Sequence, residues 1–96
     1  MQTNLKRKIE LRESIMLGVV EILITALQLK IEPNDLDPDT PLFGSGLGLD
    51  SVDAVVFIVE LESRFNISIS EEEGRQALRT VNSTIDLVIG KTKDND

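Results

Sequence analysis

The chain contains no cysteine and no histidine. Without cysteine it can form neither a disulfide nor a thiolate zinc site. Without histidine it has no Ser-His triad and no imidazole base, and it lacks the commonest protein ligand of transition metals. We therefore predict that the protein is not an enzyme and that it holds no metal ion, because no residue supplies acid–base chemistry at neutral pH.

Aromatic residues are also scarce, at 3% of the chain, with no tryptophan and no tyrosine. A surface that stacks nucleic-acid bases needs exposed aromatic side chains, and the net charge of −7 opposes binding to a phosphate backbone. No apolar run is long enough to cross a bilayer, and no signal peptide is visible. These absences predict a cytoplasmic protein that binds no nucleic acid and inserts into no membrane.

The negative charge is unevenly distributed along the 96 residues. Residues 31–63 contain no lysine or arginine and have a net charge of −8, so the remainder of the chain has a net charge of +1. The acids of this segment are Glu32, Asp35, Asp37, Asp39, Asp50, Asp53, Glu60 and Glu62. Such a surface keeps a protein soluble, and it also favours encounter with partner proteins that carry basic docking patches.

Hydrophobic periodicity predicts a long first helix over Asn4–Lys30, and Pro33 prevents much continuation. Residues 31–50 form a long loop broken by prolines and glycines, with leucines and Phe43 as its anchors. The predicted anchors are Leu36, Leu42, Phe43, Leu47 and Leu49. Basic residues crowd the first turns of the first helix, which opposes its dipole and indicates either fraying or a separate contact role.

A second helix is predicted over residues 51–65, with Ala54, Ile58, Leu61 and Phe65 as its core stripe. Beside this stripe lies a second apolar strip, which we call the valine strip: Val52, Val55, Val56 and Val59. A helix this apolar is either nearly enclosed or docks on something else.

A short third helix is predicted from the Ser70 cap to about Arg79, and a last helix from an Asn82 or Ser83 cap to about Lys91. The tail from Thr92 is predicted to be disordered. The fold class is therefore all-α: a small four-helix bundle with a long loop between the first two helices and a short third helix. We expect one domain over residues 1–96, with an ordered core of about 5–91.

Three candidate sites fail on spacing. Asp35, Asp37 and Asp39 have the first ligand spacing of a calcium loop, but the sixth position is not glycine and the twelfth is not glutamate, so Asp-Pro turns explain them better. The glycine-rich stretch 44–48 lacks the lysine of a phosphate loop and fits no hydrolase elbow. Glu60 and Glu62 fall on different faces of the second helix, so they form no catalytic pair.

Ser51 stands directly after Asp50 at the predicted start of the second helix. A helix start presents unpaired N–H groups and the positive end of the dipole, so a phosphate ester on this serine is electrostatically favoured. The simpler interpretation of these residues alone is that Asp50 is an ordinary cap and Ser51 is an ordinary first-turn residue.

The surrounding motifs add a resemblance. The segment 48–52, Gly-Leu-Asp-Ser-Val, looks like the D-S-[LIV] attachment motif of acyl carrier proteins. Residues 61–69 are similar to the L-E-x-x-F-x-I-x-I segment of that family, and the acidic turn 71–73 and the Thr-Val pair 80–81 also match. Leu42-Phe43 before the glycines fits the loop that precedes the motif. The resemblance covers roughly residues 11–90, nearly the whole chain.

The resemblance implies that Ser51 bears 4′-phosphopantetheine, with Asp50 beside it. A phosphopantetheinyl transferase would supply the group from coenzyme A together with its own base and Mg²⁺. It also implies a monomeric carrier of acyl thioesters that serves enzymes of fatty-acid, polyketide or related lipid or secondary-metabolite biosynthesis. The residues expected to recognise partners are Asp50, Val52, Asp53, Val56 and Glu60. The second helix has more apolar surface than one core face needs, so we expect Phe57, Ile58 and Leu61 to shelter the acyl chain.

Two departures from the family pattern indicate a specialised member. Gly46 stands where the family often has an aspartate, and Val56 stands where it often has a glutamate. Two alternatives stay open at this point. One is an aminoacyl or peptidyl carrier, and the other is a cofactor-free helical adaptor that docks partners through the valine strip.

Overall fold

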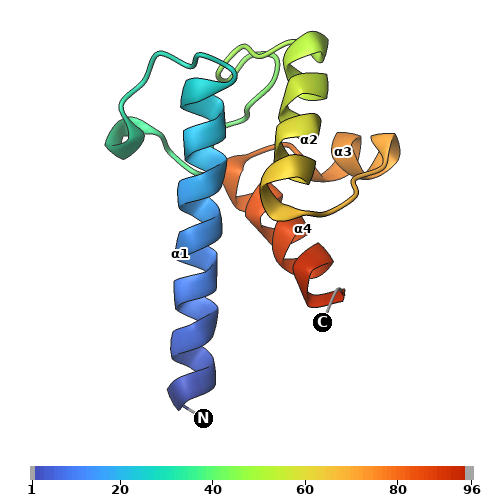
Figure 1. The fold of residues 1–96 in the computed structure, drawn as a ribbon. Coiled ribbons are helices and arrows are strands. Elements are labelled where there is room, and N and C mark those ends of the chain that lie inside the picture. Colours follow the sequence, from blue (N-terminus) through green and yellow to red (C-terminus); the bar gives the residue numbers. More distant parts are fainter. Residues whose placement is uncertain (1, 95–96) are drawn as a thin grey trace.

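The computed structural model describes residues 2–94, and these form four helices joined by loops (Figure 1). The helices are α1 (Gln2–Thr25), α2 (Ser51–Phe65), α3 (Glu71–Ala77) and α4 (Val81–Asp94), and a short 3-10 helix, η1, covers Pro33–Asp35. The described residues contain no β-strand, so the predicted all-α class and the short third helix are confirmed. That the domain spans 1–96 stays a prediction.

Helix α1 packs against both α4 and α2, and α3 packs against α4. A single hydrophobic cluster joins the four helices and the loop. Its members are Ile15, Val19, Val20, Ile22, Leu23, Leu36, Leu42, Leu49, Phe57, Leu61, Ile67, Ile69, Leu78, Val81, Ile85 and Val88. Gly18 allows α1 and α2 to approach closely, because a Cβ there would lie 2.7 Å from the Cζ atom of Phe65. The salt bridge from Arg64 to Glu21, at 3.2 Å, spans the same two helices.

Helix α1 ends at Thr25, so the predicted end at Lys30 is wrong. Gln28 adopts a left-handed backbone conformation, with φ of 56°, which a helix cannot contain. The N–H groups of Leu27 and Leu29 turn back to the carbonyls of Ile22 and Leu23, at 3.2 and 3.0 Å. These hydrogen bonds satisfy the last carbonyls of the helix, so the chain turns before the apolar periodicity ends.

The long loop is fixed to the bundle by buried leucines and by backbone hydrogen bonds. Leu36, Leu42 and Leu49 are buried, and Phe43 and Leu47 pack on the core, which confirms the predicted anchors. The Leu42 N–H donates to the Arg79 carbonyl at 2.9 Å, and the Asn82 N–H donates to the Pro38 carbonyl at 3.0 Å. The loop is thereby held against the junction of α3 and α4.

The last two helices differ from the prediction at their ends. Helix α3 stops at Ala77 rather than near Arg79, because Leu78 leaves helical geometry as it enters the core. Thr80, not Asn82 or Ser83, caps α4: its hydroxyl accepts from the Ser83 N–H at 3.0 Å. The predicted disorder from Thr92 is wrong as far as Asp94, where α4 ends, and residues 95–96 lie outside the described range.

Glu73 of α3 contacts both Ser70, the residue before the helix, and Lys91 of α4. Its carboxylate accepts from the Ser70 N–H at 2.9 Å and lies 2.6 Å from the Lys91 ammonium of α4. The contact with Lys91, followed by the hydrogen bond from Ser70, lowers the pKa of Glu73 from 4.5 to about 2. A carboxyl group whose pKa falls on folding stabilises the native state above its unfolded pKa, and this stabilisation disappears as the pH falls through the folded value.

Glu73→Gln should therefore lower the melting temperature at pH 7, since glutamine can still accept from the Ser70 N–H but has no charge for Lys91. The difference from the wild type should persist down to about pH 4.5 and shrink as the pH falls toward about 2. Glu72→Gln is the matched control, because Glu72 lies in the same first turn and is exposed. Thermal melts of both variants across this pH range measure the effect. Equal losses in the two variants at pH 7 would contradict the assignment.

Candidate functional site

Ser51 is the first residue of α2, and its side chain is exposed. Asp50 is the N-cap, and its carboxylate accepts from the Asp53 N–H at 2.9 Å. The Asp53 carboxylate in turn accepts from the Asp50 N–H, also at 2.9 Å. This capping box fixes the backbone on both sides of Ser51 while leaving the serine side chain on the surface.

The pKa of Asp50 lies below its ordinary value, chiefly because the Asp53 N–H donates to its carboxylate, with further help from the Asp53 side chain and the Val52 N–H. Asp50 is therefore ionised at neutral pH. A fixed negative charge thus stands next to the serine, at the positive end of the α2 dipole.

The chain enters α2 through a narrow turn. Gly44 and Gly48 have φ of 72° and 77°, a region that favours glycine. Between them the chain folds back, so that Phe43 and Leu49 form an isolated parallel bridge and the Leu49 N–H donates to the Leu42 carbonyl at 3.1 Å. Leu49 is buried, and it therefore anchors the residue next to the cap in the core.

Position 46 requires glycine for a steric reason. A Cβ at this position would lie 1.8 Å from the Pro41 carbonyl oxygen, and the neighbouring Leu47 N–H donates to that same oxygen at 2.9 Å. No side chain fits there without moving backbone. The aspartate that the family often has at this position is therefore incompatible with the loop as this chain folds it.

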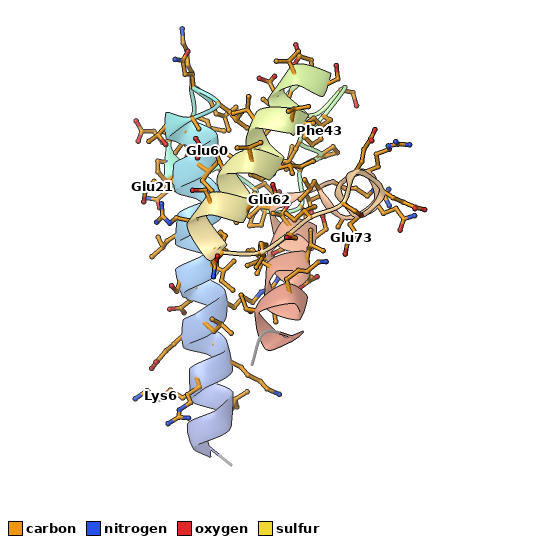
Figure 2. All side chains as sticks on the ribbon, turned by 45° about the vertical axis from the view of Figure 1, so that its right-hand side comes forward. Lys6, Glu21, Phe43, Glu60, Glu62 and Glu73 are labelled. Atoms are coloured by element: carbon orange, nitrogen blue, oxygen red, sulfur yellow. The ribbon has the colours of Figure 1, made fainter. Side chains whose placement is uncertain are left out.

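A cavity of about 530 Å³ opens beside Ser51, between α2, α3 and the end of the loop. Its lining includes Ser51 and Asp50 and also Arg75 and Glu71, which form an ion pair at 2.8 Å. The complete lining is Phe43, Leu49, Asp50, Ser51, Ala54, Val55, Ile58, Glu71, Gly74, Arg75 and Leu78. Figure 2 shows Phe43 next to the upper part of α2, where the helix begins. The size and the mainly apolar lining suit a small apolar ligand.

Of the three residues expected to line an acyl site, only Ile58 lines this cavity. Phe57 and Leu61 are fully buried in the bundle core and are not part of the lining. The sequence reasoning missed Gly74 of α3 and Leu78, which directly follows α3, because the contact of this segment with α2 is tertiary. A Cβ on Gly74 would lie 2.8 Å from the Ile58 Cδ1 atom, so this glycine allows Ile58 to lie against α3.

Most of the valine strip faces solvent. Val52, Val55 and Val59 are 68%, 61% and 56% exposed, and Val56 is half-buried without belonging to the core cluster. Asp50, at the start of α2, is exposed. Asp53 and Glu60, which are two turns apart on one face of α2, are half-buried. Of the five residues expected to recognise partners, Asp50 and Val52 are therefore exposed, and Asp53, Val56 and Glu60 are half-buried.

The acidic residues form no metal site in the part of the chain that the structure describes, where no cluster of possible ligands occurs. The Asp39 N–H donates to the Asp37 carboxylate at 2.9 Å, which is the turn chemistry expected around Pro38. Glu60 and Glu62 leave α2 in different directions (Figure 2), and Glu62 accepts from the Ile69 N–H at 2.9 Å. None of the helices within residues 2–94 is both long and apolar enough to cross a membrane.

Comparison with known proteins agrees with this geometry. The family described as "Phosphopantetheine attachment site" matches residues 19–88, which contain all of α2, α3 and the loop before them. An acyl carrier protein of Chlorobium phaeobacteroides is 30% identical over 73 residues, which cover 76% of this chain and 88% of that protein. The match identifies the cofactor as covalently attached 4′-phosphopantetheine and the chain as a non-catalytic carrier. The chain belongs to the acyl carrier protein family.

Proposed function

We propose that Ser51 carries the 4′-phosphopantetheine and that the protein, as a cytoplasmic monomer, presents acyl groups to synthase or acyl-transferring enzymes. The observation that supports this most directly is an exposed serine at a capped helix start, beside a mainly apolar cavity. Fatty-acid, polyketide or a related lipid or secondary-metabolite biosynthesis would use such a carrier.

The attachment chemistry needs little from this chain. The Ser51 hydroxyl oxygen would attack the phosphorus of coenzyme A that bears the pantetheine. As the new P–O bond forms, the bond from this phosphorus to the bridging oxygen of the pyrophosphate breaks, and 3′,5′-ADP leaves with that oxygen. The hydroxyl proton passes to a base of the transferase, since this chain has no histidine. The positive end of the α2 dipole would stabilise the charge of a phosphodiester on Ser51.

The bound arm supplies a terminal thiol that holds an acyl group as a thioester. The residues of this chain determine where an acyl chain can go. Ala54 and Ile58 lie one and two turns along α2 from Ser51 and line the cavity, and Leu78 closes it from the C-terminal end of α3. An apolar cavity beside the attachment serine favours acyl cargo over the polar cargo of an aminoacyl or peptidyl carrier.

Loading tests the attachment residue directly. With coenzyme A, Mg²⁺ and a broad-specificity phosphopantetheinyl transferase, the wild type should gain the mass of one phosphopantetheine, because Ser51 is exposed next to a fixed cap. Ser51→Ala should gain nothing while its helical circular dichroism persists. Ser63→Ala, which changes another exposed serine of α2, is the control and should load fully. Loading of Ser51→Ala would refute the assignment, and failure of all three proteins to load would favour the cofactor-free adaptor.

Sheltering of the acyl chain should appear as thermal stability. A medium-length acyl form should melt several degrees above the form with the bare arm, because a ligand buried only in the native state shifts the unfolding equilibrium. For a domain of this size, about 1 kcal/mol corresponds to about 4–8 °C. Ala54→Leu should remove most of this difference by filling the cavity.

Val52→Leu is the matched control for the cavity. Val52 is on the same helix and 68% exposed, and it is not among the residues that line the cavity. The acyl-dependent rise should be the same in this variant as in the wild type. If the wild type itself shows no rise, the acyl chain lies outside the cavity.

Charge on α2 should accelerate partner encounter. The kcat/KM of loading by the transferase should fall as salt is added, since steering by exposed charges is screened. Glu60→Lys should lower kcat/KM several-fold at low salt, and the two proteins should converge at high salt. Glu32→Lys makes the same charge change in the loop and should have a much smaller effect. Equal effects of the two substitutions would mean that net charge, rather than the α2 face, attracts the partner.

A further inference from the structure

The first part of α1 has no role in the function described so far. Residues 2–18 precede the region that matches the carrier family, which begins at residue 19. In both views the beginning of α1 extends past the other helices, and Lys6 lies on this extension (Figures 1 and 2). The start of α2, with Ser51, lies toward the opposite end of the molecule (Figure 1).

A single stripe of α1 runs from the buried core onto this extension. Spacings of alternately four and three residues, which keep side chains on one helix face, connect Leu5, Ile9, Arg12, Met16, Val19 and Leu23. Val19 and Leu23 are fully buried, and Met16 is half-buried against the core. Leu5 and Ile9 on the same stripe are 61% and 51% exposed. The apolar stripe thus continues beyond the helices that cover it.

Arg12 marks the boundary between the two parts of the stripe. Its guanidinium donates to the Asp86 carboxylate at 2.8 Å and to the Asn82 side chain at 3.1 Å, both on α4. This contact closes the bundle at its last covered position. Toward the beginning of α1, the stripe has the pattern of a helix–helix contact without a second helix among the described residues.

The residues beside the exposed stripe are basic. Lys6 and Lys8 immediately flank Leu5 and Ile9 and occupy the positions that choose the partner in a coiled coil. Residues 1–14 contain four basic and two acidic residues, a net charge of +2, whereas the rest of the chain has a net charge of −9. The extension therefore differs from the body in both apolar exposure and charge sign.

We propose that this face of α1, made by Leu5 and Ile9 with Lys6 and Lys8, docks an amphipathic helix of a partner protein whose flanking residues are acidic. The partner helix continues the stripe that α4 and α2 cover farther along α1. Apolar side chains supply the contact, and the two lysines select a negatively charged partner. The docking is independent of Ser51, because the two surfaces lie at different ends of the molecule.

Two other occupants fit less well. An anionic membrane would attract the lysines, but Leu5 and Ile9 offer little area to insert, and the body with its charge of −9 would be repelled. A second copy could offer its valine strip and the acidic residues beside it, but such a head-to-tail contact would build rings or open chains of many copies. It would also cover the surface proposed for the enzymes.

The test uses the full-length protein loaded with phosphopantetheine and two synthetic three-heptad helical peptides with Leu and Ile in the seam. One peptide has glutamate at the flanking positions and the other has lysine. In NMR titrations the glutamate peptide should perturb the amides around residues 5–13, and the lysine peptide should not. The double variant Leu5→Ser with Ile9→Ser should weaken binding at least tenfold, and the unloaded wild type should bind the peptide as tightly as the loaded protein.

A charge exchange gives the sharpest outcome. The double variant Lys6→Glu with Lys8→Glu should lose the glutamate peptide and gain the lysine peptide. Its melting temperature should be no lower than that of the wild type, because both lysines are exposed and glutamate near the helix start suits the dipole. Val55→Ser with Val59→Ser is the control and should leave binding unchanged. No binding of the glutamate peptide, or equal binding of both peptides, would overturn the proposal. Binding to vesicles of anionic phospholipid, or sedimentation as a dimer or longer chain through Leu5 and Ile9, would overturn it in favour of those occupants.

Discussion

The fixed position of Leu42 is the constraint on which the loop and the entry to α2 depend. Its side chain is fully buried, its N–H donates to Arg79 at the junction of α3 and α4, and its carbonyl accepts from Leu49. One residue thus joins the long loop, the last two helices and the entry to α2. If this anchor moved, the cap at Asp50 and the wall of the cavity would move with it, because both depend on where Leu49 enters the core.

The proposed attachment site combines a rigid backbone with an accessible side chain. The reciprocal hydrogen bonds of Asp50 and Asp53 satisfy N–H groups at the start of α2 without using Ser51. The absence of histidine is consistent with this arrangement, since a carrier needs a nucleophile that a partner activates only on contact. In the proposed attachment reaction the base belongs to the partner, and this chain supplies position, charge and an apolar space beside the serine.

The two departures from the family pattern have different physical meanings. Gly46 follows from the loop itself, because a Cβ there would collide with the Pro41 carbonyl oxygen. No contact within residues 2–94 requires valine at position 56, because Val56 is half-buried and is not packed into the core cluster. The first departure therefore follows from how this loop folds, and the second changes the surface that we propose for partner recognition.

The sequence by itself determined the all-α class, the start of α2 at Ser51 and the leucine anchors of the loop. These depend on local rules: a cap before a helix, an apolar period, and prolines and glycines that prevent regular structure. Only the tertiary structure decided where α1 ends, because the left-handed turn at Gln28 competes with a helical period that continues beyond it. Tertiary structure also separated Ile58, which lines the cavity, from Phe57 and Leu61, which fill the core. All three are apolar residues of one helix, and only the placement of α3 against α2 distinguishes a cavity wall from a core contact.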